Sequence, residues 1–282
     1  MQKSHLKGLA LVKDFYVRRL FRIYPLSILA VLVAVALHLH ADGRGLSFGP
    51  RPGGLEFISN VLLIQNLTYS NSIIGPLWSL PLEVQMYLVL PFLFLWRNLS
   101  FWRLLVLWAV CGVLGHFPQA IPSLAWLSLL IFVPNFLPGV MAFTRPQKRF
   151  IPSFVWPPFI LLLAVVFVWE PSRQMGAELC LLLGIALPSF KEITFPPLKV
   201  VSHHLATYSY GIYLGHSFFI WWALTLHNNW IVFWLMWLTI PPILYYAFER
   251  PMIKLGRRLA ARIARAPQTD TVAEGRPAQQ PG

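Results

Sequence analysis

Charge is what this sequence has least of. Charged residues make up 12% of its 282 positions, apolar residues make up 57%, and the mean hydropathy is +0.61. An ordinary soluble domain has about 25% charged residues, so the charges here are too few to cover a soluble globule. The same scarcity excludes an intrinsically disordered chain, which combines low hydrophobicity with high net charge. We therefore expect a membrane protein.

Cysteine is also scarce, because Cys111 and Cys180 are the only two. Both lie inside apolar runs, which excludes a disulfide scaffold, a thiolate metal site and an iron–sulfur protein. The sequence also has no HExxH metalloprotease motif, no P-loop and no nucleophile elbow. We accordingly expect neither a bound metal nor a bound cofactor.

The apolar residues gather in stretches of about 16–22 residues, and a transmembrane helix needs about 20. There are eight such stretches, at residues 20–40, 77–96, 101–117, 123–143, 154–169, 175–190, 205–226 and 230–248. A shorter mixed run at 55–69 contains three amides, and we expect it to be re-entrant or interfacial. The sequence therefore predicts an all-α polytopic membrane protein, a bundle of about eight transmembrane helices.

The basic residues predict an orientation. There are 23 Lys and Arg against 10 Asp and Glu, which gives a net charge of +13. With a cytoplasmic N-terminus, only Arg44, Arg51 and Arg173 fall in outer segments, and the other 20 fall inside. This positive-inside distribution predicts a cell-membrane (cytoplasmic or inner membrane) protein with both termini cytoplasmic. Since these charges act as topology signals, we expect no nucleic-acid partner.

Composition divides the chain unequally. We expect residues 1–256 to form one integral-membrane domain. We expect residues 257–282 to form a cytoplasmic tail, with a short basic helix followed by a disordered segment rich in Pro, Gln and Gly.

The first motif with chemical content lies at the inner end of the first apolar stretch, and it contains Arg18, Arg19 and Arg22. Arg18 and Arg22 are four residues apart and share a helix face. Guanidinium groups bind phosphate through two parallel hydrogen bonds and stay charged. The alternative is that these arginines only anchor the helix, as the positive-inside rule requires.

The second motif starts at Trp78 and places Ser79, Glu83 and Tyr87 on one helix stripe, at i, i+4 and i+8. A carboxylate inside an apolar span is costly, so it normally faces a partner or a cavity. The alternative is an interfacial glutamate close enough to the headgroups to remain hydrated.

The third motif lies in the seventh stretch, where Ser209, Tyr213 and His216 share a face and Tyr210 lies beside them. His216 is expected about 17 Å from the inner end of its span, at 1.5 Å per residue. It could act chemically, or it could simply hydrogen-bond between helices.

The fourth motif is Glu249-Arg250-Pro251, at the end of the last stretch. Glu249 could pair with one of the inner arginines. The alternative, and the favoured one, is that the Arg–Pro step simply ends the helix.

In identity and order, the four motifs together resemble membrane acyltransferase family 3. The likeness extends from about residue 14 to residue 251, with little motif content between residues 100 and 200. The residues that carry it are Arg18-Arg19-Leu20-Phe21-Arg22-Ile23-Tyr24-Pro25, Trp78-Ser79-Leu80 with Glu83, Tyr87 and Pro91, Ser209-Tyr210 with Tyr213-Leu214 and His216, and Glu249-Arg250-Pro251.

The resemblance implies an integral-membrane O-acyltransferase. Such an enzyme moves an acyl group, often acetyl, from acyl-CoA as co-substrate to a hydroxyl of a cell-surface or secreted carbohydrate, so the implied partners are the lipid bilayer, acyl-CoA and a carbohydrate acceptor. Arg18, Arg19 and Arg22 would bind acyl-CoA, while Glu83 toward the outer face and His216 at mid-depth are the candidate catalytic residues. The supporting polar residues are Trp78, Ser79, Tyr87, Ser209, Tyr210, Tyr213 and Glu249.

The sequence departs from the family pattern at its beginning. The resemblance implies two further N-terminal helices, the first of which carries the histidine regarded as the catalytic base. Here the arginine motif starts at Arg18 with no apolar span before it, and His5 lies in a polar stretch. We therefore expect a chain truncated relative to the family. Two alternatives follow, a catalytically inactive remnant or subunit of that family and a transporter of a polar lipid.

Overall fold

The computed structural model describes residues 9–42, 45–95, 100–115 and 130–265 of the chain. These residues are mostly helical, which confirms the all-α class. The two strands among them form a small antiparallel hairpin in which Leu39 pairs with Phe48 and Ala41 with Leu46. The segment expected to be disordered after residue 267, His5, and residues 123–129 of the fourth apolar stretch lie outside the described residues.

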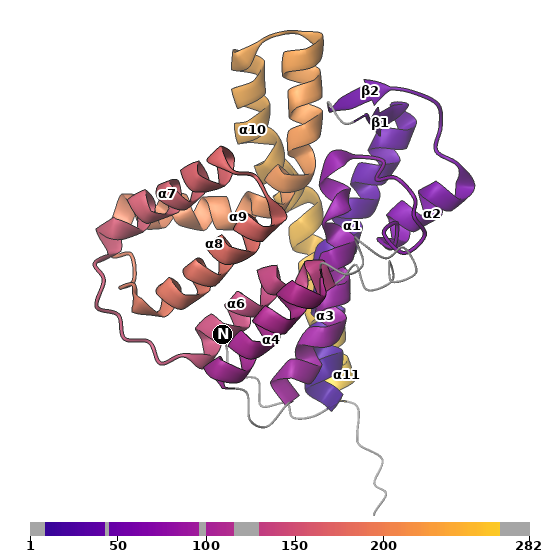
Figure 1. The fold of residues 1–282 in the computed structure, drawn as a ribbon. Coiled ribbons are helices and arrows are strands. Elements are labelled where there is room, and N and C mark those ends of the chain that lie inside the picture. Colours follow the sequence, from indigo (N-terminus) through magenta and orange to yellow (C-terminus); the bar gives the residue numbers. More distant parts are fainter. Residues whose placement is uncertain (1–8, 43–44, 96–99, 116–129, 266–282) are drawn as a thin grey trace, which may run out of the picture.

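The helices of the described residues form two groups (Figure 1). Each group has its own buried core. The first core contains Val31, Leu63, Ile74 and Leu77, and the second contains Leu104 and Met141. The first group comprises α1 (Leu9–Ala36), β1 (Leu39–Ala41), β2 (Leu46–Phe48), α2 (Gly54–Leu62), α3 (Leu80–Leu95), α9 (Pro196–Phe219), α10 (Trp230–Leu244) and α11 (Arg250–Arg265). The second group comprises α4 (Phe101–Leu114), α6 (Val133–Thr144), α7 (Trp156–Trp169) and α8 (Arg173–Ala186).

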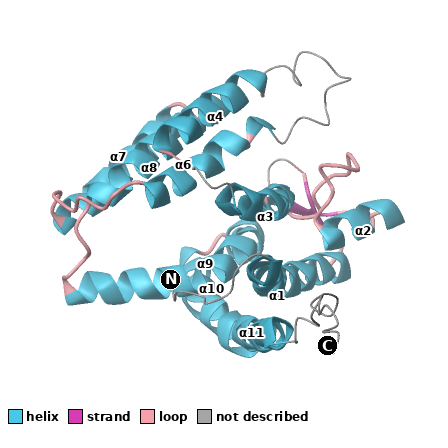
Figure 2. Ribbon diagram, turned by 90° about the horizontal axis from the view of Figure 1, so that it is seen from below, coloured by secondary structure: helices cyan, strands magenta, loops and turns pink. Residues whose placement is uncertain are grey.

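The two groups run in different directions. Figure 2, which looks from below, shows α1 and α3 nearly end-on, whereas α4, α6, α7 and α8 lie side-on across the view. Contacts between the groups include Leu90 of α3, which packs on the second core, and the rings of Trp78 and Phe132, whose centroids are 6.1 Å apart. The layer of α4 to α8 therefore lies against α3 rather than alongside α1.

This arrangement does not confirm a bundle of about eight spans. Within the described residues, each predicted stretch contains a helix, but only Ala10–Ala36 and Trp230–Ile263 are long and apolar enough to cross a membrane. The helices of the second group have 12–14 residues. At 1.5 Å per residue they reach about 18–21 Å, which is short of the ~30 Å hydrocarbon layer.

The last helix is longer than the sequence suggested. The expectation that Arg250-Pro251 ends it is wrong, because α10 continues through the π-helical turn η6 (Tyr245–Glu249) into α11. The wide turn precedes Pro251, where the proline ring would otherwise crowd the carbonyl of residue 247. The domain boundary expected after residue 256 also falls inside α11. Gly256 and Ala260 are buried there and pack the helix against α1.

Several helices expose apolar side chains. The segment at 55–69 contains only the nine-residue α2, so it is not a span. α2 buries Ser59 and Asn60, and turns Leu55 and Ile58 outward. α7 has no buried residue, and Val168 is 77% exposed. Such faces are typical of contact with lipid rather than water.

Candidate functional site

Two adjoining cavities bring the four sequence motifs together. The first, of about 460 Å³, lies between α1, α9, η6 and α11, and the second, of about 480 Å³, lies between α1, α3 and α9. Both are lined by Arg19 and Arg22, so the cavities meet at these side chains. The first is also lined by Asp14, Arg18, Glu249 and Arg257, and the second by Ser79, Glu83, Tyr87, Ser209, Tyr210 and Tyr213.

Two aromatic rings and a hydrogen-bond chain that ends at Glu83 hold the guanidinium of Arg19 in place. Its Nη1 donates to the Tyr87 hydroxyl at 3.2 Å, and that hydroxyl donates to Oε1 of Glu83. The guanidinium carbon of Arg19 also lies 4.7 Å from the centroid of the Tyr87 ring and 5.4 Å from that of Phe15. Glu83 was expected toward the outer face, away from the arginines. It instead lies level with Arg19, because α3 runs antiparallel to α1 and brings Tyr87 and Glu83 onto the arginine stripe.

The three arginines of α1 differ in their partners. Arg18 forms an ion pair with Asp14, one turn earlier, with Nη2 2.9 Å from Oδ1 and Nε at 3.0 Å. Asp14 is buried and Arg18 is exposed. No residue in the described part of the chain forms a hydrogen bond or a close ion pair with the guanidinium of Arg22, which is exposed at the junction of the cavities. Arg22 is therefore the arginine best placed to bind an incoming anion.

Glu249 is a buried carboxylate in a cavity lined by arginines. It is 4% exposed, and no described residue hydrogen-bonds to its Oε2. Arg22 acts on it electrostatically, but no close ion pair joins them in the described chain. The alternative in which Glu249 pairs with an inner arginine is therefore met only by this longer-range attraction to Arg22. Buried polar atoms are normally hydrogen-bonded, so Oε2 remains available to accept from a ligand.

Tyrosine hydroxyl groups of α9 form hydrogen bonds to α1 and to the segment that precedes α3. The Tyr213 hydroxyl donates to the carbonyl of Pro76 at 2.9 Å and lies 2.5 Å from Oγ of Ser79. The Tyr210 hydroxyl donates to the carbonyl of Ile23 on α1 at 2.7 Å. The stripe predicted for Ser79, Glu83 and Tyr87 does face one cavity, and α9 supplies the opposite wall.

Two predicted site residues lie apart from this cavity wall. Nδ1 of His216 is 2.5 Å from the carbonyl oxygen of Tyr213, so Nδ1 carries the proton and Nε2 is unprotonated in the neutral ring. His216 is one turn beyond Tyr213 and lines neither cavity, so the structure does not bring it together with Glu83. Trp78 precedes α3 and is 58% exposed, and it lines an apolar cavity whose other walls come from α6, α7, α8 and the residues next to them.

Sequence reasoning missed two charged residues of the site. Asp14 precedes Arg18 by four residues, and this i,i+4 spacing was the available signal. Arg257 had been assigned only to the tail. Within the described segments, no group of three His, Cys, Asp or Glu side chains lies close enough to hold a metal ion.

Comparisons with known proteins add no relative. The chain matches no family model, no curated protein and no solved structure. The resemblance to membrane acyltransferase family 3 therefore depends on the four sequence motifs alone.

Proposed function

We propose that the chain is a multi-pass membrane O-acyltransferase, similar to membrane acyltransferase family 3, that moves an acyl group, typically acetyl, from acyl-CoA to a hydroxyl of a cell-surface or secreted carbohydrate. One observation carries this proposal. Motifs more than 200 residues apart in the sequence line two cavities that share Arg19 and Arg22. Topology signals alone would not require Glu83, Tyr87 and Tyr213 to face the same arginines.

The first cavity suits the phosphates of CoA. Arg22 and Arg257 are exposed and lie within reach of a ligand, whereas Arg18 and Arg19 are held by Asp14 and Tyr87. A guanidinium group presents its donors in a fixed planar fork, so it can bind phosphate through two parallel hydrogen bonds. The unpartnered Oε2 of Glu249 can accept a hydrogen bond from a neutral donor on the same ligand.

The second cavity suits the transfer step. The acceptor hydroxyl attacks the thioester carbonyl, the carbon–sulfur bond breaks, CoA leaves as its thiolate, and a base takes the hydroxyl proton. Glu83 lines the cavity, so it is our first candidate for that base. His216 lies one turn farther along α9 than Tyr213 and lines neither cavity, so it is the second candidate.

A location in the cytoplasmic or inner membrane is part of the proposal. Two helices of sufficient length and the exposed apolar faces of α2, α7 and α10 support it. So does the charge distribution of the sequence, because an eight-span topology with a cytoplasmic N-terminus places 20 of the 23 basic residues on the inner side.

The test is acetyl-CoA consumption by membranes that contain the full chain, measured as released CoA thiol. We expect consumption above control membranes, and a loss of at least tenfold in Arg19→Gln and Glu83→Gln. Lys13→Gln is the matched control, because Lys13 is exposed on the same helix and lines neither cavity. Acetyl-CoA binding without consumption would contradict the proposal and favour the inactive remnant. Flux of a polar lipid without acetyl-CoA consumption would favour the transporter.

A further inference from the structure

Another cavity, which shares no lining residue with the two arginine cavities, lies where α6 ends, α7 begins and α8 ends. Two connections, 145–152 and 187–193, pair there through a parallel bridge between Ile151 and Phe190. The amide of Ile151 donates to the carbonyl of Ser189 at 2.9 Å, and the amide of Lys191 donates back to the carbonyl of Ile151 at 2.8 Å. The backbone of this junction is thus fixed by hydrogen bonds.

The cavity has an apolar floor and a cationic rim. Its volume is about 540 Å³, and its floor includes Trp156 and Phe190, whose rings pack edge-to-face at 4.7 Å. Arg149, Lys191 and Glu192 are exposed and line the rim. The rim therefore carries a net positive charge next to an aromatic surface.

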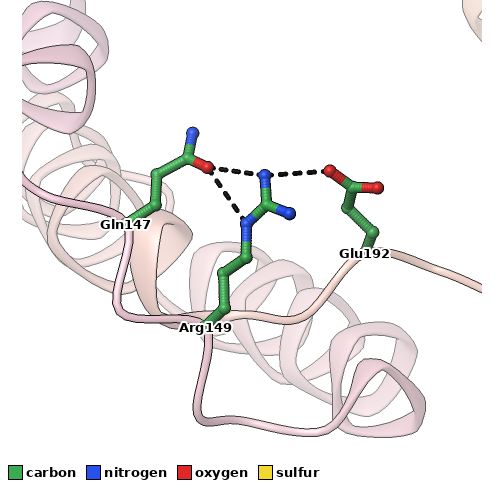
Figure 3. A network of polar contacts seen from close by, with 3 residues as sticks. All are labelled: Gln147, Arg149 and Glu192. Carbon is green, nitrogen blue, oxygen red and sulfur yellow. Dashed lines mark hydrogen bonds and ion pairs between the residues drawn. The ribbon is translucent and has the colours of Figure 1, made fainter.

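Arg149 is held in place at this rim, as Figure 3 shows. Oε1 of Gln147 accepts from its Nε at 3.0 Å and from its Nη2 at 2.6 Å, and Oε1 of Glu192 lies 2.9 Å from Nη2. The φ angle of Arg149 is +43°, a left-handed conformation that costs free energy for any residue except glycine. Among the described residues, none accepts from Nη1. Strain maintained by surrounding contacts is a feature of binding sites.

We propose that this cavity binds the phosphate of an anionic membrane lipid, through Nη1 of Arg149 and the ammonium of Lys191. A lipid fits better than a soluble phosphate, because Trp156 is the first residue of α7 and the exposed apolar side chains of that helix follow it. A bound headgroup would thus have its acyl chains along α7, as in basic pockets at the ends of membrane helices. The inference rests on the proposal that the chain is a membrane protein, but not on acyl transfer.

Native mass spectrometry of the full chain in neutral detergent tests the site, with phosphatidylglycerol or phosphatidylcholine added. We expect wild type to retain phosphatidylglycerol in preference to phosphatidylcholine. We expect the Arg149→Gln/Lys191→Gln double variant to retain at least fivefold less phosphatidylglycerol than wild type. The matched control is Lys199→Gln/Arg258→Gln, which removes the same charge from exposed positions outside this cavity. An equal loss in both double variants, or no loss in the first, would overturn the proposal.

Two further arms make the result specific. Lys191→Gln alone leaves the Arg149 contacts intact and is expected to lose part of the bound lipid, so retention equal to wild type would count against the site. Soluble sn-glycerol 3-phosphate is expected to leave phosphatidylglycerol in place, and displacement would overturn the lipid assignment. Acetyl-CoA consumption, measured in parallel, is expected to be equal in both double variants, which separates this test from that of acyl transfer.

Discussion

At the scale of single residues, the structure distinguishes side chains that the sequence treated alike. Spacing alone predicted that Arg18, Arg19 and Arg22 lie together, and all three line one cavity. The prediction that they lie at a helix end is wrong, because α1 begins at Leu9 and the arginines fall near its middle. The contacts of Arg19 could not be predicted, because Tyr87 and Glu83 are more than 60 residues away in the sequence and their position beside Arg19 depends on how α3 packs. Arg18 and Arg19 are largely engaged, whereas Arg22 is open to a ligand.

The Tyr87 hydroxyl yields a prediction of stability. It accepts from Arg19 and donates to Glu83, so Tyr87→Phe leaves both charged groups without this partner. We expect a loss of about 1–3 kcal/mol in the free energy of unfolding, measured by thermal unfolding in detergent. Tyr69→Phe is the control, since Tyr69 is 77% exposed. A similar shift in both variants would show that the Tyr87 contacts are not stabilising.

The two candidate bases can be ranked by kinetics. Because Glu83 lines the second cavity and His216 does not, Glu83→Gln should reduce kcat by about 100-fold or more, the size of a lost general base. His216→Gln should reduce it by less than about tenfold, as for loss of support from a neighbouring group. The measurement is acetyl-CoA turnover in membranes at saturating substrate. The reverse ranking would show that His216 of α9, and not Glu83, is the base.

At the scale of elements, sequence patterns found the helices but not how they join. Each apolar stretch contains a helix within the described residues, since hydropathy and length were enough to locate them. The prediction that the helix ends at Arg250-Pro251 was wrong. A proline normally ends a helix unless a wide turn precedes it, and no sequence pattern indicated the π-helical turn η6. The packing of α6 against α8 could not be predicted from the sequence either. This packing depends on the close approach of the two backbones at Gly184.

That glycine is the second stability test. A Cβ added to Gly184 of α8 would lie 2.5 Å from the carbonyl oxygen of Pro138 in α6, so Gly184→Ala should cost about 1–3 kcal/mol by overpacking. Gly112→Ala in α4 is the matched control, because its Cβ would meet no atom within 4 Å. There alanine should be neutral or stabilising by about 0.5–1 kcal/mol. Thermal unfolding of both variants checks this, and a stabilised Gly184→Ala would disprove the close approach.

At the scale of the whole molecule, composition was informative about the environment but not about the arrangement. A low charge content and exposed apolar helices agree with a bilayer as solvent. Hydropathy reports how apolar a helix is, not the direction in which it packs. It could therefore not show that α4, α6, α7 and α8 lie across α1.

The proposed orientation is testable by labelling with a membrane-impermeant maleimide. In a chain with Cys111 and Cys180 replaced by Ser, Arg51→Cys should react in intact cells, whereas Lys148→Cys should react only after lysis. Both positions are exposed, so burial does not explain a difference. Reaction of both variants in intact cells would refute the assignment of inner and outer segments.

The central claim is that four distant motifs form one acyl-CoA site around Arg19 and Arg22. Equilibrium binding of labelled acetyl-CoA to the purified full chain, at rising salt concentration, tests it most directly. We predict saturable binding that weakens with salt, a Kd at least tenfold higher in Arg22→Gln, and an unchanged Kd in Lys13→Gln. Equal affinity in wild type and Arg22→Gln, or no saturable binding in wild type, would contradict the claim.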